Sequence, residues 1–215
     1  MSYGPGYLTS YPLYELTNLV AMEATGNTLV KDVNKAETKY KAAVSQRKVD
    51  FSPLEALLTR ILAEVILSGA SPNAVLQTRS LIRKLRGTRA VAKDPKVPAE
   101  DYQSVSQKNH DDVVANFERL VMMVADDANY DPMVDVLKVI ALESLLEVLT
   151  TANTAVIDAK AILDTARINR NNFFNTKVTG LVDVFMTAKK VVLASFGFKS
   201  EEFGKVKGLE FRRIY

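Results

Sequence analysis

The sequence predicts an all-α protein: an elongated helical bundle with long antiparallel helices and a degenerate internal duplication. Residues 133–179 contain no glycine or proline, and their apolar residues recur in steps of three and four. The whole chain of 215 residues holds only 9 glycines and 7 prolines, a composition that favours helix. The third observation is that the two ends of the chain repeat a similar order of predicted helices.

The longest predicted helix runs from Pro132 to about Phe174. Asp131 and Pro132 give its expected start, because an acidic N-cap followed by proline suits the first helical turn. Two neighbouring apolar stripes follow this helix, one through Leu145 and Val148 and the other through Leu142 and Leu149. A helix with two apolar stripes needs neighbours on two sides, so we expect it to lie at the centre of the bundle.

The first part of the chain divides into a flexible N-terminus, residues 1–10, and a first helical repeat, residues 11–87. The repeat starts with a long helix over about 13–49. Ser52-Pro53 and Ser71-Pro72 each predict a further helix start, since serine caps a helix and proline fits its first position. Gly69 and Gly87 mark the two helix ends.

The second part begins with a predicted linker, residues 88–110, which holds two prolines and no apolar periodicity. Residues 111–208 follow as a connecting helix and a second helical repeat, packed with the first repeat as one bundle. Its helices are expected to break near 175–180 and to stop at Gly197. Alternating apolar residues in the C-terminal tail, 209–215, predict an extended segment that packs back on the helices.

The internal duplication depends on short matches. Residues 27–32 align with residues 153–158 at an offset of 126, and Gly69 aligns with Gly197 at a similar offset. The alternative is that two pairs of amphipathic helices resemble each other by chance.

Polar residues inside the matching stretches have two explanations. They are Asn27, Thr28 and Asp32 in the first repeat, and Asn153, Thr154 and Asp158 in the second. One explanation is that they hydrogen-bond across a pseudo-twofold contact and fix the register of the long helices, because a wrong register leaves buried polar groups unpaired. The other is that both sets face water.

Short motifs spread over most of the chain resemble a family of small helical proteins from Bacteroidota bacteria. The motifs are Arg86-Gly87-Thr88-Arg89-Ala90, Ser104-Val105-Ser106-Gln107 followed by Asn116-Phe117, Asn153-Thr154-Ala155-Val156, Ala166-Arg167-Ile168-Asn169-Arg170-Asn171, Thr179-Gly180-Leu181-Val182-Asp183 and Gly208-Leu209-Glu210-Phe211. That family carries no assigned activity. The resemblance therefore implies a helical, duplicated fold and assigns no catalytic or binding residue.

The residues that carry most enzyme chemistry are scarce. There is no cysteine, and the one histidine, His110, precedes Asp111 and Asp112. A metal site there would also need Asp126 and Asp127, and helix capping explains the cluster better. Since no nucleophile motif or phosphate-binding glycine loop is present, we expect no catalytic residue, metal or cofactor, and no enzyme.

One segment, residues 79–93, concentrates positive charge without an intervening acid: Arg79, Arg83, Lys84, Arg86, Arg89 and Lys93. Such a run can bind phosphates, an anionic membrane surface or an acidic partner. Against this, the segment has no aromatic residue for stacking on bases, and the net charge of the chain is only +3. A solvated basic face is favoured over an anion-binding site.

These observations favour a non-catalytic structural or protein-interaction module, with self-association as one form of it. Binding of nucleic acid or another polyanion through 79–93 is the alternative, and membrane activity of amphipathic helices is a further one. The N-terminus lacks the features of a signal peptide, and no run of about 18 uncharged apolar residues occurs. We therefore expect a cytoplasmic protein with protein partners and no membrane span; a nucleic-acid partner is not favoured.

Overall fold

A computed structural model describes residues 7, 9–88 and 109–213. Within these ranges the regular structure is entirely helical, with no strand, which confirms the all-α prediction. The chain divides into two compact units: unit 1 holds residues 1–41 and 159–215, and unit 2 holds residues 42–158. Helices α1 (Leu16–Phe51) and α5 (Val139–Asn175) contribute to both units.

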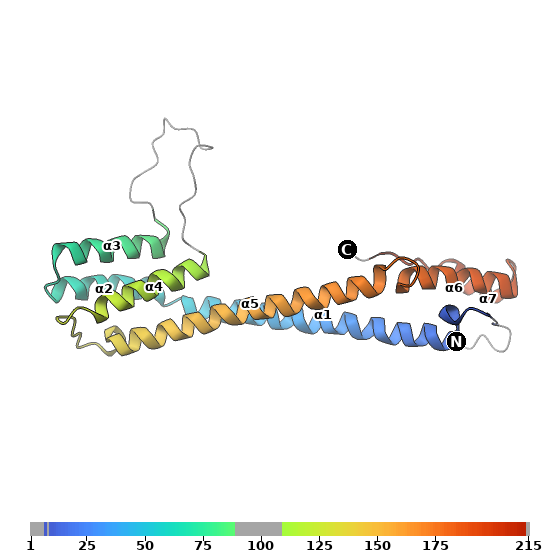
Figure 1. Cartoon of the computed structure of the whole chain (residues 1–215), viewed down its shortest axis with the longest axis horizontal. Helices are drawn as coiled ribbons and strands as arrows, with labels where there is room; N and C mark the ends of the chain where they lie inside the picture. The colour runs from blue at the N-terminus through green and yellow to red at the C-terminus, as the bar shows by residue number, and fades with distance from the viewer. Residues whose placement is uncertain (1–6, 8, 89–108, 214–215) are drawn as a thin grey trace, which may run out of the picture. The chain divides into compact units, whose positions relative to one another are not determined.

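Unit 2 is built around helices α2 (Leu54–Leu67), α3 (Pro72–Arg86) and α4 (His110–Ala125), with the adjoining ends of α1 and α5. Helix α3 packs against both α2 and α4, as Figure 1 shows. The core consists of apolar side chains from these helices that are almost fully buried, among them Leu58, Ile61, Phe117, Leu120, Leu142 and Leu149. The predicted connecting helix is therefore a central part of this unit.

The predicted start and end signals of the helices are only partly confirmed. Ser71 accepts a hydrogen bond from the Ala74 amide, and Gly87 ends α3 in the left-handed conformation with a φ of 63°. These two signals are confirmed. The prediction that Ser52 caps α2 is wrong, because its hydroxyl donates to the Val49 carbonyl of the preceding helix instead.

The long helix α5 begins at Val139, so the predicted start at Pro132 is wrong. A short 3₁₀ turn, η4 (Asp135–Leu137), lies between them. The Tyr130 hydroxyl donates to the Leu137 carbonyl at 2.9 Å, which holds this connection out of the helix. Burial, followed by the charge of Glu64, raises the pKa of Tyr130 to about 12, so the phenol keeps the proton that makes this bond.

The prediction of no membrane span also needs correction. By length and composition, α5 is apolar enough to cross a membrane, and it is the single helix of the described residues that passes this test. The sequence criterion demanded an uncharged run, whereas two glutamates, Glu143 and Glu147, are the only charges between Val139 and Ile157. Buried residues make up 28% of the apolar window. The remaining residues of the window are partly buried or exposed, and Val139, Leu145 and Leu146 pack against the core of unit 2.

Unit 1 combines the N-terminal part of α1 and the C-terminal part of α5 with η2 (Pro12–Tyr14), α6 (Leu181–Phe196) and α7 (Glu201–Lys207). Val33 and Ala36 of α1 are buried with Leu163 of α5. Gly26, seven residues before Val33, lies beside Phe174 at the far end of α5, so the two segments run antiparallel in this unit. A Cβ on Gly26 would lie 2.9 Å from Leu181 Cδ1. This glycine therefore permits close packing of helices.

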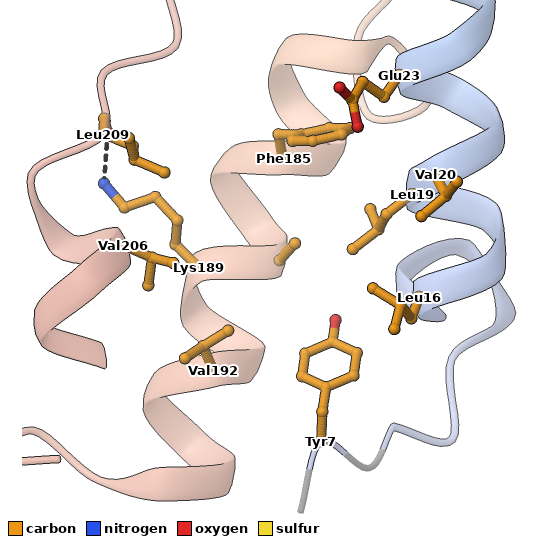
Figure 2. A pocket seen from close by; sticks show the side chains of 11 residues that line it. Tyr7, Leu16, Leu19, Val20, Glu23, Phe185, Lys189, Val192, Val206 and Leu209 are labelled. Atoms are coloured by element: carbon orange, nitrogen blue, oxygen red, sulfur yellow. Dashed lines mark hydrogen bonds between the residues drawn. The ribbon is translucent and has the colours of Figure 1, made fainter. Parts of the chain in front are cut away.

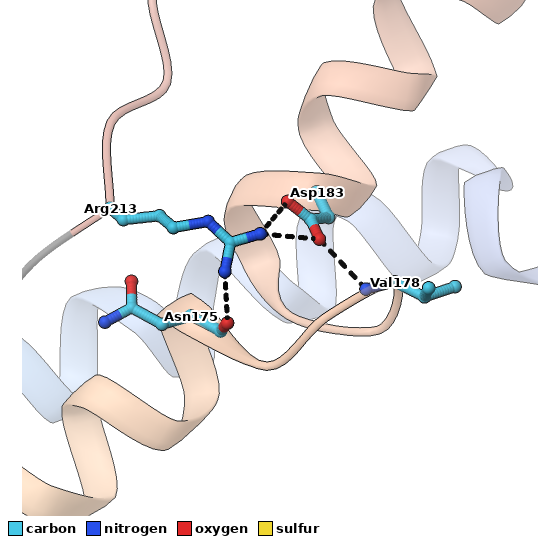
Figure 3. Close-up of polar contacts among 4 residues, drawn as sticks. All are labelled: Asn175, Val178, Asp183 and Arg213. Carbon is cyan, nitrogen blue, oxygen red and sulfur yellow. Dashed lines mark hydrogen bonds and ion pairs between the residues drawn. The ribbon is translucent and has the colours of Figure 1, made fainter.

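The tail after α7 packs on unit 1, as Figure 3 shows at the α5–α6 connection. The Arg213 guanidinium donates to the Asn175 carbonyl at 2.9 Å and to both carboxylate oxygens of Asp183. The same carboxylate accepts from the Val178 amide at 2.9 Å. The Val178 amide, followed by Arg213, holds the pKa of Asp183 below its ordinary value. Residues 209–213 are not helical and residues 214–215 lie outside the described residues, so the extended conformation of the tail stays a prediction.

Replacing Val178 with asparagine is expected to stabilise unit 1 by about 1 kcal/mol, because a β-branched residue is strained in the left-handed region that asparagine tolerates. Val178 has a φ of 71°, and its side chain is 67% exposed, so little packing is lost. The midpoint of chemical denaturation measures the effect. The matched control, Val49→Asn on the exposed side of α1, should leave the stability nearly unchanged, because valine and asparagine have similar helix propensities; equal responses at both positions would contradict the strain argument.

The element order shows a regularity that concerns the predicted duplication. A 3₁₀ turn, a helix of 36 residues and two shorter helices open the chain, and a 3₁₀ turn, a helix of 37 residues and two shorter helices close it. Contacts nevertheless group the chain across these halves, since each predicted repeat, 11–87 and 111–208, contributes to both units. The duplication and the single bundle stay predictions.

Candidate functional site

The basic segment is divided between exposed and bound side chains. Arg79, Arg83 and Lys84 are exposed on α3. Arg86 is half-buried: its guanidinium donates to the Thr59 hydroxyl of α2 at 2.6 Å. Arg86 therefore joins α3 to α2 and is the least suited of these cations to meet a phosphate.

Two of the predicted anion-binding residues, Arg89 and Lys93, lie outside the described residues, as do residues 89–108 of the predicted linker and residues 1–6 and 8 of the predicted flexible N-terminus. Arg83, Lys84 and Arg86 occupy the last turn of α3, where cations interact favourably with the helix dipole. This is a structural reason for part of the charge run. Anion binding through 79–93 stays a prediction.

The six polar residues of the two matching stretches have unequal surroundings. Asn27, Thr28 and Asp32 are exposed on α1, and the Thr28 hydroxyl donates to the Ala24 carbonyl of its own helix. Thr154 and Asp158 are exposed on α5. Asn153 alone of the six is buried, with 7% of its surface exposed.

Asn153 lies at a polar junction where parts of α1, α4 and α5 meet in unit 2. Its side-chain oxygen accepts from Arg47 Nη1 at 2.8 Å, and its side-chain nitrogen donates to Asp111 Oδ1 at 2.5 Å. A single buried amide thus connects a cation on α1 with a carboxylate on α4. Because an amide offers its donor and its acceptor in fixed positions, this bridge selects one alignment of the three helices.

His110 borders this junction at the first position of α4. Its ring meets the Phe51 ring edge to face, with the centroids 5.0 Å apart. Burial, followed by the positive charge of Arg47, lowers the pKa of His110, and Asp111 acts in the opposite direction. The neutral imidazole is therefore favoured in the folded state. The Asn109 side chain, which accepts from the Asp112 amide, caps the helix immediately before it.

This arrangement predicts that acid weakens unit 2. A histidine with a lowered folded pKa binds its proton more readily when unfolded, so its contribution is present above about pH 6.5 and is lost as the pH falls below that value. Unfolding curves at pH 7.5, 6.5 and 5.5 for the native protein and His110→Gln measure the effect. We expect a smaller loss of stability in His110→Gln. Parallel losses in the two proteins would contradict the assignment.

The sequence analysis weighed a metal site around His110, Asp111, Asp112, Asp126 and Asp127 and favoured helix capping instead. The part of the chain that the structure describes contains no group of three or more His, Asp or Glu side chains placed to hold a metal ion. The arrangement around His110 is a junction between helices, with Arg47 and Asp111 bound to the Asn153 amide. Its chemistry is that of a structural hydrogen-bond network.

An apolar surface that the sequence did not predict lies where the chain enters α5. It is formed by residues 133–140 and is called the 133–140 segment. Four of its side chains are exposed: Met133, Val134, Val136 and Ile140. Met133 and Ile140 are the most accessible of the four, at 91% and 73%. These residues were expected to belong to a buried helix that started at Pro132. No signal in the sequence marks this exposure, because it accompanies the bond from the Tyr130 hydroxyl to the Leu137 carbonyl, which only the folded chain shows.

Comparisons with models of protein families, with curated proteins and with solved structures found no match. The resemblance to helical proteins of Bacteroidota bacteria therefore stays a prediction, and the site is interpreted from its own geometry.

Proposed function

We propose that this chain is a non-catalytic helical protein-interaction module that associates with a second copy of itself. The observation that carries the proposal is the exposed apolar 133–140 segment. Clustered apolar side chains rimmed by polar ones are typical of interaction surfaces. Apart from Asp135 and Lys138, every residue of this segment is apolar.

The segment is held in place on the core of unit 2. Leu137 is buried, its carbonyl accepts from Tyr130, and Val139 packs against the core cluster. A surface that is fixed before binding loses less conformational freedom on association, and so more of its apolar contact contributes to affinity.

The charges of the segment favour an uncharged partner surface. Lys138 Nζ lies 2.7 Å from Asp135 Oδ1, so the two charges compensate each other. With no net charge to match, an apolar surface is complementary to another copy of itself, as a twofold symmetric contact requires.

Light scattering coupled to size-exclusion chromatography tests the proposal over a range of concentrations. We expect a mass that rises above the 23.8 kDa of one chain as concentration increases. The double variant Met133→Gln/Ile140→Gln should remain a monomer, because burying amide groups without partners opposes association. Val49→Gln, which changes an exposed apolar residue of α1, is the matched control and should behave like the native protein. A native protein that stays at 23.8 kDa at every concentration would contradict self-association.

Membrane association is a second candidate. The length and apolar composition of α5 favour it. A helix with this length and composition gains free energy from contact with lipid as well as with protein. Flotation with vesicles of neutral phospholipid distinguishes the two functions. Recovery of the native protein with the vesicles supports the membrane candidate, whereas recovery in the protein fraction as an oligomer supports self-association.

A further inference from the structure

Unit 1 contains an apolar pocket, partly open to solvent, with a volume of about 210 Å³, shown in Figure 2. It lies between the first turns of α1 and helix α6. Tyr7, which precedes η2, and Leu209, which follows α7, also line it. Its walls are formed by Tyr7, Leu16, Leu19, Val20, Glu23, Phe185, Ala188, Lys189, Val192, Val206 and Leu209. None of these residues belongs to the polar junction or to the 133–140 segment.

The pocket lies between side chains of α1 and α6. Figure 2 shows Leu16 and Leu19 of α1 directed toward α6. Ala188 lines the α6 wall and is buried, so α6 presents its smallest side chain there. Covering an apolar wall with an apolar molecule removes that wall from water, which is favourable.

The polar groups of the wall are already engaged with the protein. Lys189 Nζ donates to the Lys207 carbonyl at 2.9 Å and to the Leu209 carbonyl at 2.7 Å, which directs it toward the tail. The Tyr7 hydroxyl donates to the Tyr14 carbonyl at 2.6 Å. The Glu23 carboxylate disfavours an anionic occupant, and the apolar side chains that form the rest of the wall favour an uncharged one.

We propose that the pocket binds a small neutral apolar molecule, the size of one aromatic ring with a short alkyl substituent. The size argument compares volumes: an enclosed apolar cavity of about 150 Å³ binds benzene, and this partly open pocket offers about 210 Å³. The energetic argument is that such a molecule restores van der Waals contacts that the wall atoms lack when the pocket is empty. This inference concerns unit 1 and does not depend on self-association through unit 2.

The test uses isobutylbenzene as the neutral probe and benzoate as the anionic comparison, with the full chain. We expect isobutylbenzene to raise the melting temperature of the native protein in a saturable manner and to shift the NMR signals of the Leu16, Leu19 and Val192 methyl groups. Benzoate should bind at least tenfold more weakly. Absence of any methyl shift would overturn the proposal, and equal binding of benzoate would overturn the selection for neutral molecules.

Pocket-filling variants locate the binding. Ala188→Leu should occupy the space, raise the melting temperature without ligand and abolish the response to isobutylbenzene. Ala194→Leu, an exposed position on the same helix, is the matched control and should leave binding unchanged. If Ala188→Leu does not fold, Val20→Phe fills the pocket from the α1 wall and serves the same purpose. Binding that survives in the filled variant would place the probe elsewhere and overturn the proposal.

Discussion

Replacing Gly180 with alanine is expected to destabilise unit 1 by about 3 kcal/mol, the upper part of the usual range for overpacking. Gly180 precedes α6 and is buried in the turn after α5. A Cβ there would lie 2.5 Å from the Thr176 carbonyl oxygen and 2.7 Å from the Thr176 nitrogen. Because these atoms belong to the backbone, no side-chain rotation relieves the clash, and the turn itself must open.

Opening this turn would also affect the contacts around it. The Gly180 amide donates to the Thr176 carbonyl at 2.9 Å, and the neighbouring Val178 amide donates to Asp183. The denaturation midpoint of Gly180→Ala measures the loss. Gly204→Ala in α7 is the control, since no atom lies within 4 Å of the added methyl group, and it should gain about 1 kcal/mol from helix propensity. Similar stabilities for the two variants would refute the steric explanation.

Replacing Asn153 with leucine is expected to cost about 2 kcal/mol, the range for hydrogen bonds to charged groups. Leucine keeps most of the buried volume, so the change mainly removes the acceptor for Arg47 and the donor to Asp111. Both charged residues retain access to water, which limits the loss. Urea denaturation of the native protein and the variant gives the difference.

The sequence match supplies the control for this second change. Asn27 corresponds to Asn153 in the predicted duplication, yet it is exposed on α1. Asn27→Leu should leave the free energy of unfolding nearly unchanged. A comparable loss at both positions would mean that Asn27 has a contact equivalent to the Asn153 bridge, and would favour the original idea that both sets of polar residues fix the helix register.

The sequence left two alternatives for the polar residues of the matching stretches: both sets bridge helices, or both face water. The structure divides the two sets, because Asn153 bridges while Asn27, Thr28 and Asp32 are exposed. The partners of Asn153 are a cation on α1 and a carboxylate on α4. Neither of these partners could be identified by aligning the two matching stretches with each other.

Local chemistry accounts for the elements that sequence reasoning placed correctly. Ser71-Pro72 and Gly87 begin and end α3 because the caps and the left-handed glycine act within one turn. The same reasoning failed at Ser52 and at Pro132. At Ser52 a carbonyl of the preceding helix competes for the hydroxyl, and at Pro132 the buried Tyr130 bonds to Leu137.

The sequence by itself determined the helical class, the two long helices and most helix ends, since periodicity and capping depend on residues a few positions apart. The tertiary structure decided which polar side chains are buried, that Arg86 binds Thr59, and that Gly26 is a site of close approach. It also decided that Met133 and Ile140 are exposed and that an apolar pocket remains beside Ala188. These features depend on residues far apart in the chain, whose proximity no local pattern specifies.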